Sequence, residues 1–142
     1  MSPNSLIEKA TTIASEAHRG QSSKTGEPFI EHVRRVAESV KGDDERLVAW
    51  LHDVVEKGSG WTLDRLRREG FPERIVEAVD AMSKRDGEDY FAFVRRSIAN
   101  PLARPVKRAD LTDNLSQTLR MGGDGSKFTE GLRILRQEYP EP

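Results

Sequence analysis

The sequence predicts an all-α protein whose helices form a bundle around a metal site. Apolar residues recur at three- and four-residue spacing along most of the chain, which is the pattern of helices with one buried face. No segment shows the convincing alternation of apolar and polar residues that is typical of a half-buried strand. Three separate apolar segments also carry potential metal ligands, at His32, at His52 with Asp53, and at Asp110.

Turn and capping residues divide the chain into seven or eight expected helices. Pro28 and Pro72 each open a helix, Thr62 caps a short one, and Gly70 closes it. The expected helices cover approximately residues 5–18, 28–40, 43–57, 62–70, 72–82 and 89–98, a segment around Asp110, and a terminal segment. We expect one domain over residues 1–142, with the motifs in a core of about 5–120 and a C-terminal helix at about 126–139.

Composition narrows the class of protein. A chain of 142 residues fits one domain with a genuine core, and 35% hydrophobic with 33% charged residues is a globular balance. The formal net charge of -1 gives no reason to expect a nucleic-acid polymer or a membrane as partner. The absence of cysteine excludes disulfides, a thiolate zinc site and a cysteine nucleophile. With no signal-peptide pattern and no apolar run of ~20 residues, we expect a cytoplasmic protein.

The dipeptide His52-Asp53 interrupts an apolar helical stretch. The apolar positions around it have the spacing of one buried face and comprise Leu47, Val48, Leu51, Val54 and Val55. A carboxylate at the edge of a core is costly unless its charge is compensated. A divalent cation would compensate it, and imidazole with carboxylate suits a first-row metal. The alternative interpretation is a hydrogen-bonded buried pair with a purely structural role.

Two further segments favour the metal. His32 lies one helical turn from Phe29 and Val36 in an apolar stripe, and Asp110 lies beside Val106 in another. Three predicted helices therefore each present a ligand at or near their inward faces, in the order His, His-Asp, Asp.

This order resembles that of the HD-domain metal-dependent phosphohydrolases. The longer motifs resemble the branch that hydrolyses the alarmone (p)ppGpp, comprising SpoT-type enzymes and small stand-alone alarmone hydrolases. The resemblance extends from about Leu6 to Leu115. The matching motifs are Ala-His-Arg-Gly-Gln (Ala17–Gln21), Lys24, Gly-Glu-Pro-Phe-Ile-Glu-His (Gly26–His32), Leu-His-Asp-Val-Val-Glu (Leu51–Glu56) and Val-Lys-Arg-Ala-Asp-Leu-Thr-Asp-Asn-Leu (Val106–Leu115).

The resemblance implies an HD-domain fold that holds one divalent ion through His32, His52, Asp53 and Asp110. Two imidazoles and two carboxylates suit Mn²⁺ first, with Fe²⁺, Co²⁺ and Zn²⁺ as alternatives, and leave positions open for water and a phosphate oxygen. In this family the activated water attacks the 3′-pyrophosphate of the nucleotide and releases pyrophosphate. The expected activity is therefore that of a guanosine-3′,5′-bis(diphosphate) 3′-diphosphatase.

Other residues are candidates for catalysis and substrate contact. Glu56 lies four residues after His52 and three after Asp53, so it projects to the same side of the expected helix. From there it could deprotonate or orient the water. Asn114, four residues after Asp110, could hold the water or the substrate. Lys24 and Lys107 are candidates for phosphate contact. Asp113 fits a surface carboxylate as well as a partner of the ligands.

Two positions depart from the family pattern. Alarmone hydrolases usually have Glu-Asp after His-Asp-x-x, and this chain has Glu56-Lys57. They also tend to have Arg-Lys in the first loop, where the arginine stacks on guanine, and this chain has Ser23-Lys24. We expect Ser23 and Lys57 to line the substrate site and to reduce (p)ppGpp hydrolysis. The alternative function is a catalytically weakened module that binds metal or nucleotide for regulation.

Overall fold

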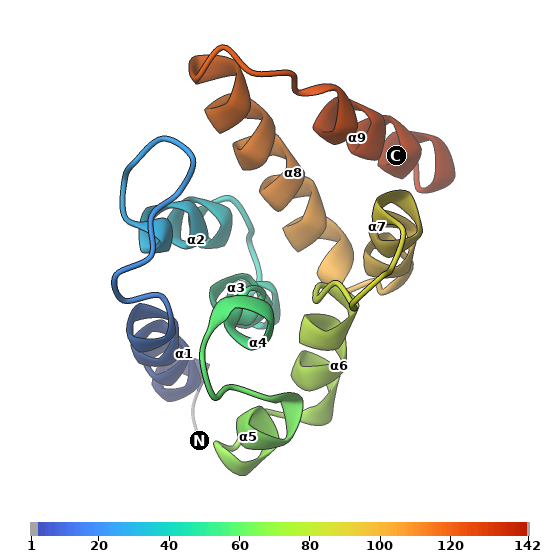
Figure 1. Ribbon diagram of the computed structural model, residues 1–142. Coiled ribbons are helices and arrows are strands. Elements are labelled where there is room, and N and C mark those ends of the chain that lie inside the picture. Colours follow the sequence, from blue (N-terminus) through green and yellow to red (C-terminus); the bar gives the residue numbers. More distant parts are fainter. Residues whose placement is uncertain (1–2, 142) are drawn as a thin grey trace.

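The computed structural model describes residues 3–141, which form nine helices and no β-strand (Figure 1). The all-helical prediction is confirmed. Residues 1, 2 and 142 of the expected domain lie outside the described part. The helices are α1 (Pro3–Ala17), α2 (Phe29–Glu38), α3 (Asp43–Leu51), α4 (Val54–Lys57), α5 (Leu63–Arg68), α6 (Glu73–Ala81), α7 (Tyr90–Ala99), α8 (Ala103–Arg120) and α9 (Ser126–Glu138).

Helix α3 lies at the centre of the bundle, in contact with α1, α2, α6 and α8 (Figure 1). Four of its nine residues are buried, Leu47, Val48, Ala49 and Leu51, and three of these are consecutive. A helix that buries residues around most of its circumference must be covered from several sides. The main core accordingly combines buried side chains from α1 through α6 with the first turns of α8.

Helix α8 is the longest and carries polar groups on its inward side. Lys107, Asp110 and Gln117 are buried there together with apolar residues such as Val106 and Leu111. Buried charged groups are costly unless they are paired or bind an ion. The polar groups on the inward side of α8 therefore need partners there, either other polar side chains or an ion.

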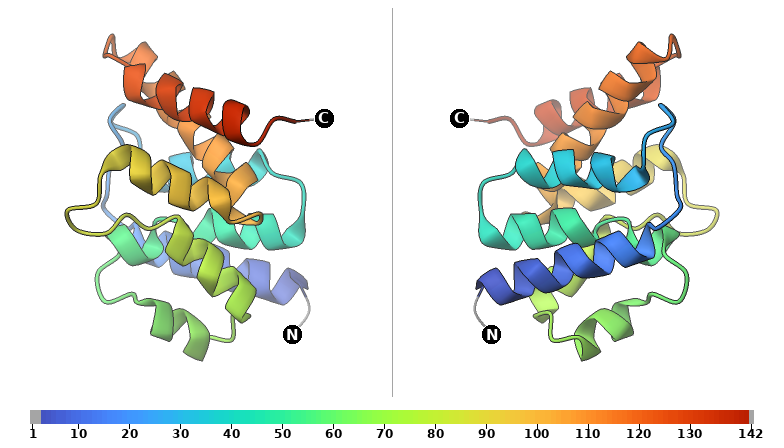
Figure 2. Two further views of the ribbon diagram at one scale, coloured as in Figure 1. Left: turned by 90° about the vertical axis from the view of Figure 1, so that its right-hand side faces the viewer. Right: turned by 90° about the vertical axis from the view of Figure 1, so that its left-hand side faces the viewer.

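Helices α7 and α9 both pack on α8 and also contact each other (Figure 2). They enclose a second, smaller core of Ile98, Ile134 and Leu135, against which Phe91 and Tyr139 pack. These three core residues lie in the later turns of α7 and α9. At the other end of the two helices, Lys127 Nζ of α9 lies 4.9 Å from the centre of the Tyr90 ring of α7. In the described part of the chain, no helix has the length and apolar character needed to cross a membrane.

The expected third helix is interrupted. The sequence predicts one helix through His52 and Asp53, whereas α3 ends at Leu51 and α4 begins at Val54. Asp53 adopts φ -106° and ψ 0°, in the sparsely allowed bridge region. The prediction of a continuous helix was wrong because the apolar spacing continues on both sides of the break, so periodicity alone does not reveal it.

The loop between α1 and α2 has a defined shape. Gly20 and Gly26 have φ values of +80° and +87°, a region that residues with a Cβ rarely adopt. Between them, the Ser23 backbone N–H donates to the Glu27 carbonyl at 2.8 Å. The substrate residues expected in this loop are therefore on a turn that a backbone hydrogen bond braces.

Candidate active site

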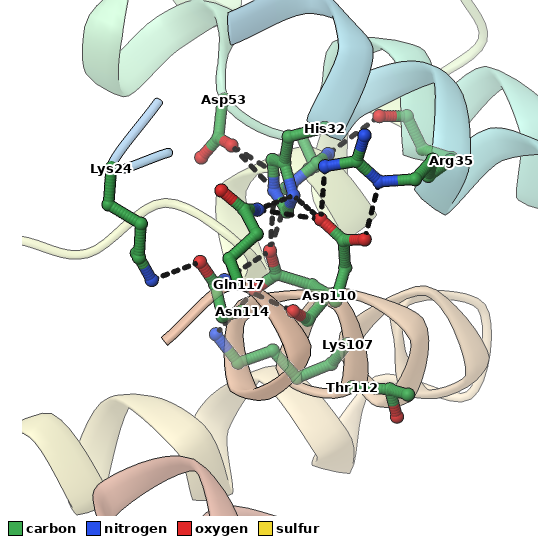
Figure 3. A network of polar contacts seen from close by, with 12 residues as sticks. Lys24, His32, Arg35, Asp53, Lys107, Asp110, Thr112, Asn114 and Gln117 are labelled. Atoms are coloured by element: carbon green, nitrogen blue, oxygen red, sulfur yellow. Dashed lines mark hydrogen bonds and ion pairs between the residues drawn. The ribbon is translucent and has the colours of Figure 1, made fainter. Parts of the chain in front are cut away.

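Four side chains from three parts of the fold converge on one point. They are His32 of α2, His52 and Asp53 of the turn between α3 and α4, and Asp110 of α8. One ligand atom from each lies within 4.8 Å of the others, and all four residues are buried. Figure 3 shows His32, Asp53 and Asp110 directed towards one another. The structure thus brings together the four ligands expected from the sequence.

The distances between these groups are short. His32 Nε2 lies 3.1 Å from Asp110 Oδ1, and His52 Nε2 lies 3.0 Å from Asp53 Oδ2 and 3.4 Å from Asp110 Oδ1. The Nε2 atoms of the two histidines and the carboxylates of the two aspartates therefore surround a space about as large as one metal ion.

His52 provides a test of whether a metal fits. Its Nδ1 donates to the Ala49 carbonyl at 2.6 Å, and because a carbonyl only accepts, Nδ1 carries the proton. Its Nε2 is buried and makes no hydrogen bond. Burial by itself lowers the pKa of His52, but the nearby Asp53 and Asp110 carboxylates raise it well above its ordinary value. The same attraction for positive charge would hold a cation, and the free Nε2 would be its ligand.

His32 is held from behind by Asp113. The Nδ1 atom lies 2.6 Å from Asp113 Oδ2, and Asp113 also accepts from Arg35 Nε at 2.6 Å and from Gln117 Nε2 at 2.7 Å (Figure 3). Burial lowers the pKa of His32, but hydrogen bonds with Asp110 and Asp113 outweigh it and raise the pKa to about 9. A carboxylate behind a ligating histidine is a common arrangement in metal sites. Asp113 is therefore a partner of the ligands and not a surface carboxylate.

The two expected catalytic residues lie beside the ligands. Glu56 lines the cavity in front of the ligands. Burial, followed by the charge of Asp53, raises the pKa of Glu56. A raised pKa makes a carboxylate a stronger base. Asn114 Nδ2 donates to Asp110 Oδ1 at 3.1 Å and to the Asp110 carbonyl at 3.0 Å. Asn114 thus fixes the orientation of a ligand carboxylate.

The cavity in front of the ligands has a volume of about 1160 Å³. All four expected substrate contacts line it, namely Ser23, Lys24, Lys57 and Lys107. Two further lysines that sequence reasoning missed also line it, Lys84 from the linker after α6 and Lys127 at the start of α9. Neither belongs to a motif, so only the fold reveals them. The lysines come from five different segments and converge on one cavity, which is typical of a site for a strongly anionic ligand.

Two of the expected substrate lysines are already near polar or aromatic groups. Lys107 is 3% exposed, with its Nζ 3.4 Å from Asp110 Oδ2 and 4.2 Å from the centre of the Phe93 ring. Lys24 Nζ lies 4.7 Å from the centre of the Phe128 ring. Burial, and then the neighbouring Lys127, lower the pKa of Lys24. An anion bound between Lys24 and Lys127 would relieve this crowding of positive charge.

The fold and the site together define a helical bundle with a candidate divalent-cation centre in a lysine-lined cleft. The chain belongs to the HD-domain family, because the family model described as HD domain matches residues 10–117.

Several curated relatives are similar over part of their length. The chain is 30% identical over 129 residues to a "Probable GTP pyrophosphokinase" of Mycobacterium leprae, covering 82% of this chain and 16% of that protein. It is 30% identical over 121 residues to the "Guanosine-3′,5′-bis(diphosphate) 3′-pyrophosphohydrolase" of Aquifex aeolicus, which covers 77% of this chain and 17% of that protein. The protein of that name from Haemophilus influenzae is 40% identical over 78 residues, which covers 52% of this chain and 11% of that protein. The chain therefore spans less than a fifth of the length of these relatives.

A solved structure shares the fold over its whole length. It is described as "A metazoan ortholog of SpoT hydrolyzes ppGpp and plays a role in starvation responses". The TM-score is 0.73 at 20% sequence identity, and 99% of each chain is covered. At this identity, the likeness shows that the two chains share a fold.

Proposed function

We propose that this protein is a metal-dependent phosphohydrolase that cleaves a pyrophosphate or phosphate group from a phosphorylated nucleotide. The observation that carries the proposal is the convergence of His32, His52, Asp53 and Asp110 on one point, next to a cavity lined by Glu56 and five lysines. The names of the relatives, which include (p)ppGpp 3′-pyrophosphohydrolases, support the reaction class.

The four ligands would hold one divalent ion, with Mn²⁺ first and Fe²⁺, Co²⁺ or Zn²⁺ as alternatives. When bound, such an ion activates water and neutralises charge on the phosphoryl group under attack. Glu56 takes the proton as the water oxygen forms its bond to phosphorus and the bond from phosphorus to the leaving oxygen breaks. Asn114 keeps Asp110 in place, and Lys24 and Lys107 offset charge on the phosphates.

The same cavity supports a substrate preference different from that of the family. Lys57 lines it, and the family pattern given above has a second acidic residue at this position, so in this chain a cation stands in place of a proton acceptor. Ser23 also lines it and offers no planar cation for stacking on guanine. We propose slow hydrolysis of ppGpp, and comparable or faster hydrolysis of another phosphorylated nucleotide.

A second candidate function rests on the same two residues. If Lys57 and Ser23 remove most turnover, the protein acts as a regulatory module that binds metal and nucleotide. The enzyme is favoured over this module because the four ligands converge and both Glu56 and Asn114 line the cavity beside them.

One experiment separates the two functions. Purified, Mn²⁺-loaded protein is incubated with ppGpp, pppGpp and a panel of adenine and guanine nucleotides, and released phosphate and pyrophosphate are measured. We expect turnover of at least one nucleotide, and none in Glu56→Gln protein that retains its metal. Nucleotide binding without turnover across the whole panel would instead establish the regulatory module.

A further inference from the structure

A row of four charged groups leads away from the ligands towards the first loop. His32 Nδ1 lies 2.6 Å from Asp113 Oδ2, and Arg35 bonds both oxygens of Asp113 through Nε at 2.6 Å and Nη2 at 3.1 Å. The same Nη2 atom also lies 2.7 Å from Glu27 Oε1. Figure 3 shows Arg35 beside His32, with its dashed contacts to both sides.

Asp113 determines which nitrogen of His32 is available. A carboxylate accepts a hydrogen bond from Nδ1–H, so with a cation in the ligand cluster Nε2 would be the nitrogen whose lone pair binds it. The two-point contact with Arg35 fixes the plane of this carboxylate, and Gln117 Nε2 occupies a further position on it at 2.7 Å. The orientation of the His32 ring therefore depends on a side chain that does not touch the metal position.

Glu27 connects this row to the loop that carries Ser23 and Lys24. Its carbonyl accepts from the Ser23 N–H at 2.8 Å, so its backbone belongs to the braced turn. Its side chain is 30% exposed and that of Arg35 is 34% exposed, so solvent screens this ion pair only in part. One end of the row is thus the expected ligand His32, and the other end, Glu27, belongs to the expected substrate loop.

We infer that Asp113 is a positioning residue for the metal, and that the Arg35–Glu27 pair couples metal binding to the order of the loop containing residues 20–28. This inference rests on the metal site of the proposed function. The coupling is reciprocal, because any group that favours the metal-bound arrangement is in turn favoured by the metal. Metal binding therefore stiffens the loop, and loosening the loop at Glu27 weakens metal binding.

The first test measures Mn²⁺ affinity by competition with a chelator. Asp113→Asn keeps the shape of the side chain and removes its charge, and should weaken binding about 10- to 100-fold. Glu27→Gln, which breaks a pair that is about one-third exposed, should weaken binding about two- to fivefold. Glu31→Gln is the matched control: Glu31 pairs with the neighbouring Arg34 at 3.4 Å and lies outside the row, so this variant should bind metal as the unmodified protein does.

The second test uses loop order and non-additivity. Mn²⁺ should slow trypsin cleavage after Lys24 in the unmodified protein and not in Arg35→Gln protein. Glu27→Gln should cause no further loss of affinity in an Asp113→Asn background, because the row is already broken.

Equal Mn²⁺ affinity of Glu27→Gln and unmodified protein, with metal bound in both, would overturn the coupling and leave the proposed function standing. Failure of the unmodified protein to bind Mn²⁺ or another first-row ion would overturn both.

Discussion

Lys24 Nζ donates to Asn114 Oδ1 at 3.1 Å, although the two residues are 90 positions apart in the chain. Asn114 in turn donates to Asp110 Oδ1 at 3.1 Å. The lysine of the first loop is therefore two hydrogen bonds from the expected metal ligand Asp110. A phosphate bound to Lys24 would lie within reach of the ligand cluster, as the proposed function requires.

Loss of a ligand should release the metal. Unmodified protein should contain about one equivalent of a first-row divalent ion by elemental analysis. His52→Ala and Asp53→Ala should each lose most of it, because the remaining donors no longer enclose the ion. Asp64→Asn is a suitable control, since Asp64 is exposed and pairs with Arg67 on the surface. Full metal content in both ligand variants would rule out the assignment.

Glu56→Gln should separate chemistry from metal binding. The amide has nearly the same shape but accepts no proton, so turnover should fall by about 10²- to 10⁴-fold. Metal content should be unchanged, because Glu56 is not among the four ligands. The measurement is steady-state turnover together with elemental analysis of the same sample. Turnover comparable to that of unmodified protein would exclude Glu56 as the base.

The two departures from the family pattern should control substrate choice. Ser23→Arg combined with Lys57→Asp restores a stacking cation and a second acidic group in the cavity, and should increase ppGpp hydrolysis. The comparison is kcat/KM for ppGpp and for the best nucleotide of the panel in both proteins. Rapid, guanine-selective cleavage of ppGpp by the unmodified protein would refute this explanation of specificity while leaving the fold intact.

Position 58 should tolerate no side chain. A Cβ there would lie 2.6 Å from the Val54 carbonyl oxygen and 2.8 Å from Ala17 Cβ, so α4 would have to move away from α1. Gly58→Ala should destabilise the protein by about 1–3 kcal/mol in urea unfolding. Gly42→Ala is the comparison, because the nearest atom to its Cβ is the flexible Glu45 carboxylate at 3.5 Å. Equal stability of the two variants would contradict this prediction.

Stability at acid pH should depend on Glu88. Arg96 donates to Glu88 at 2.8 and 2.9 Å and lowers the pKa of that carboxyl to about 2. Because the folded pKa lies below the unfolded value of about 4.3, this stabilisation is present above pH 4.3 and is lost as the pH falls towards 2. Urea unfolding between pH 5.5 and pH 2.5 should show a shallower decline for Glu88→Gln than for unmodified protein. Parallel curves would show that the pair does not contribute.

Helical periodicity and motif order predicted the all-helical fold and the convergence of His32, His52, Asp53 and Asp110. Both signals are local, since spacing of apolar residues and identity of ligand residues are written in short segments. The role of Asp113 was not predictable in this way, because its partner Arg35 is 78 positions away and only the packing of α2 on α8 brings them together. Lys127 likewise resembles a solvated residue until α9 is placed over the cavity.

The interruption between α3 and α4 determines the directions in which the side chains of His52 and Asp53 leave the backbone. In an unbroken helix, consecutive side chains leave the axis about 100° apart. At the break, Asp53 has φ -106° and ψ 0°, and its carboxylate and the His52 ring are directed to a common point. A substitution that joined α3 and α4 into one regular helix would therefore separate these two side chains and open the ligand cluster.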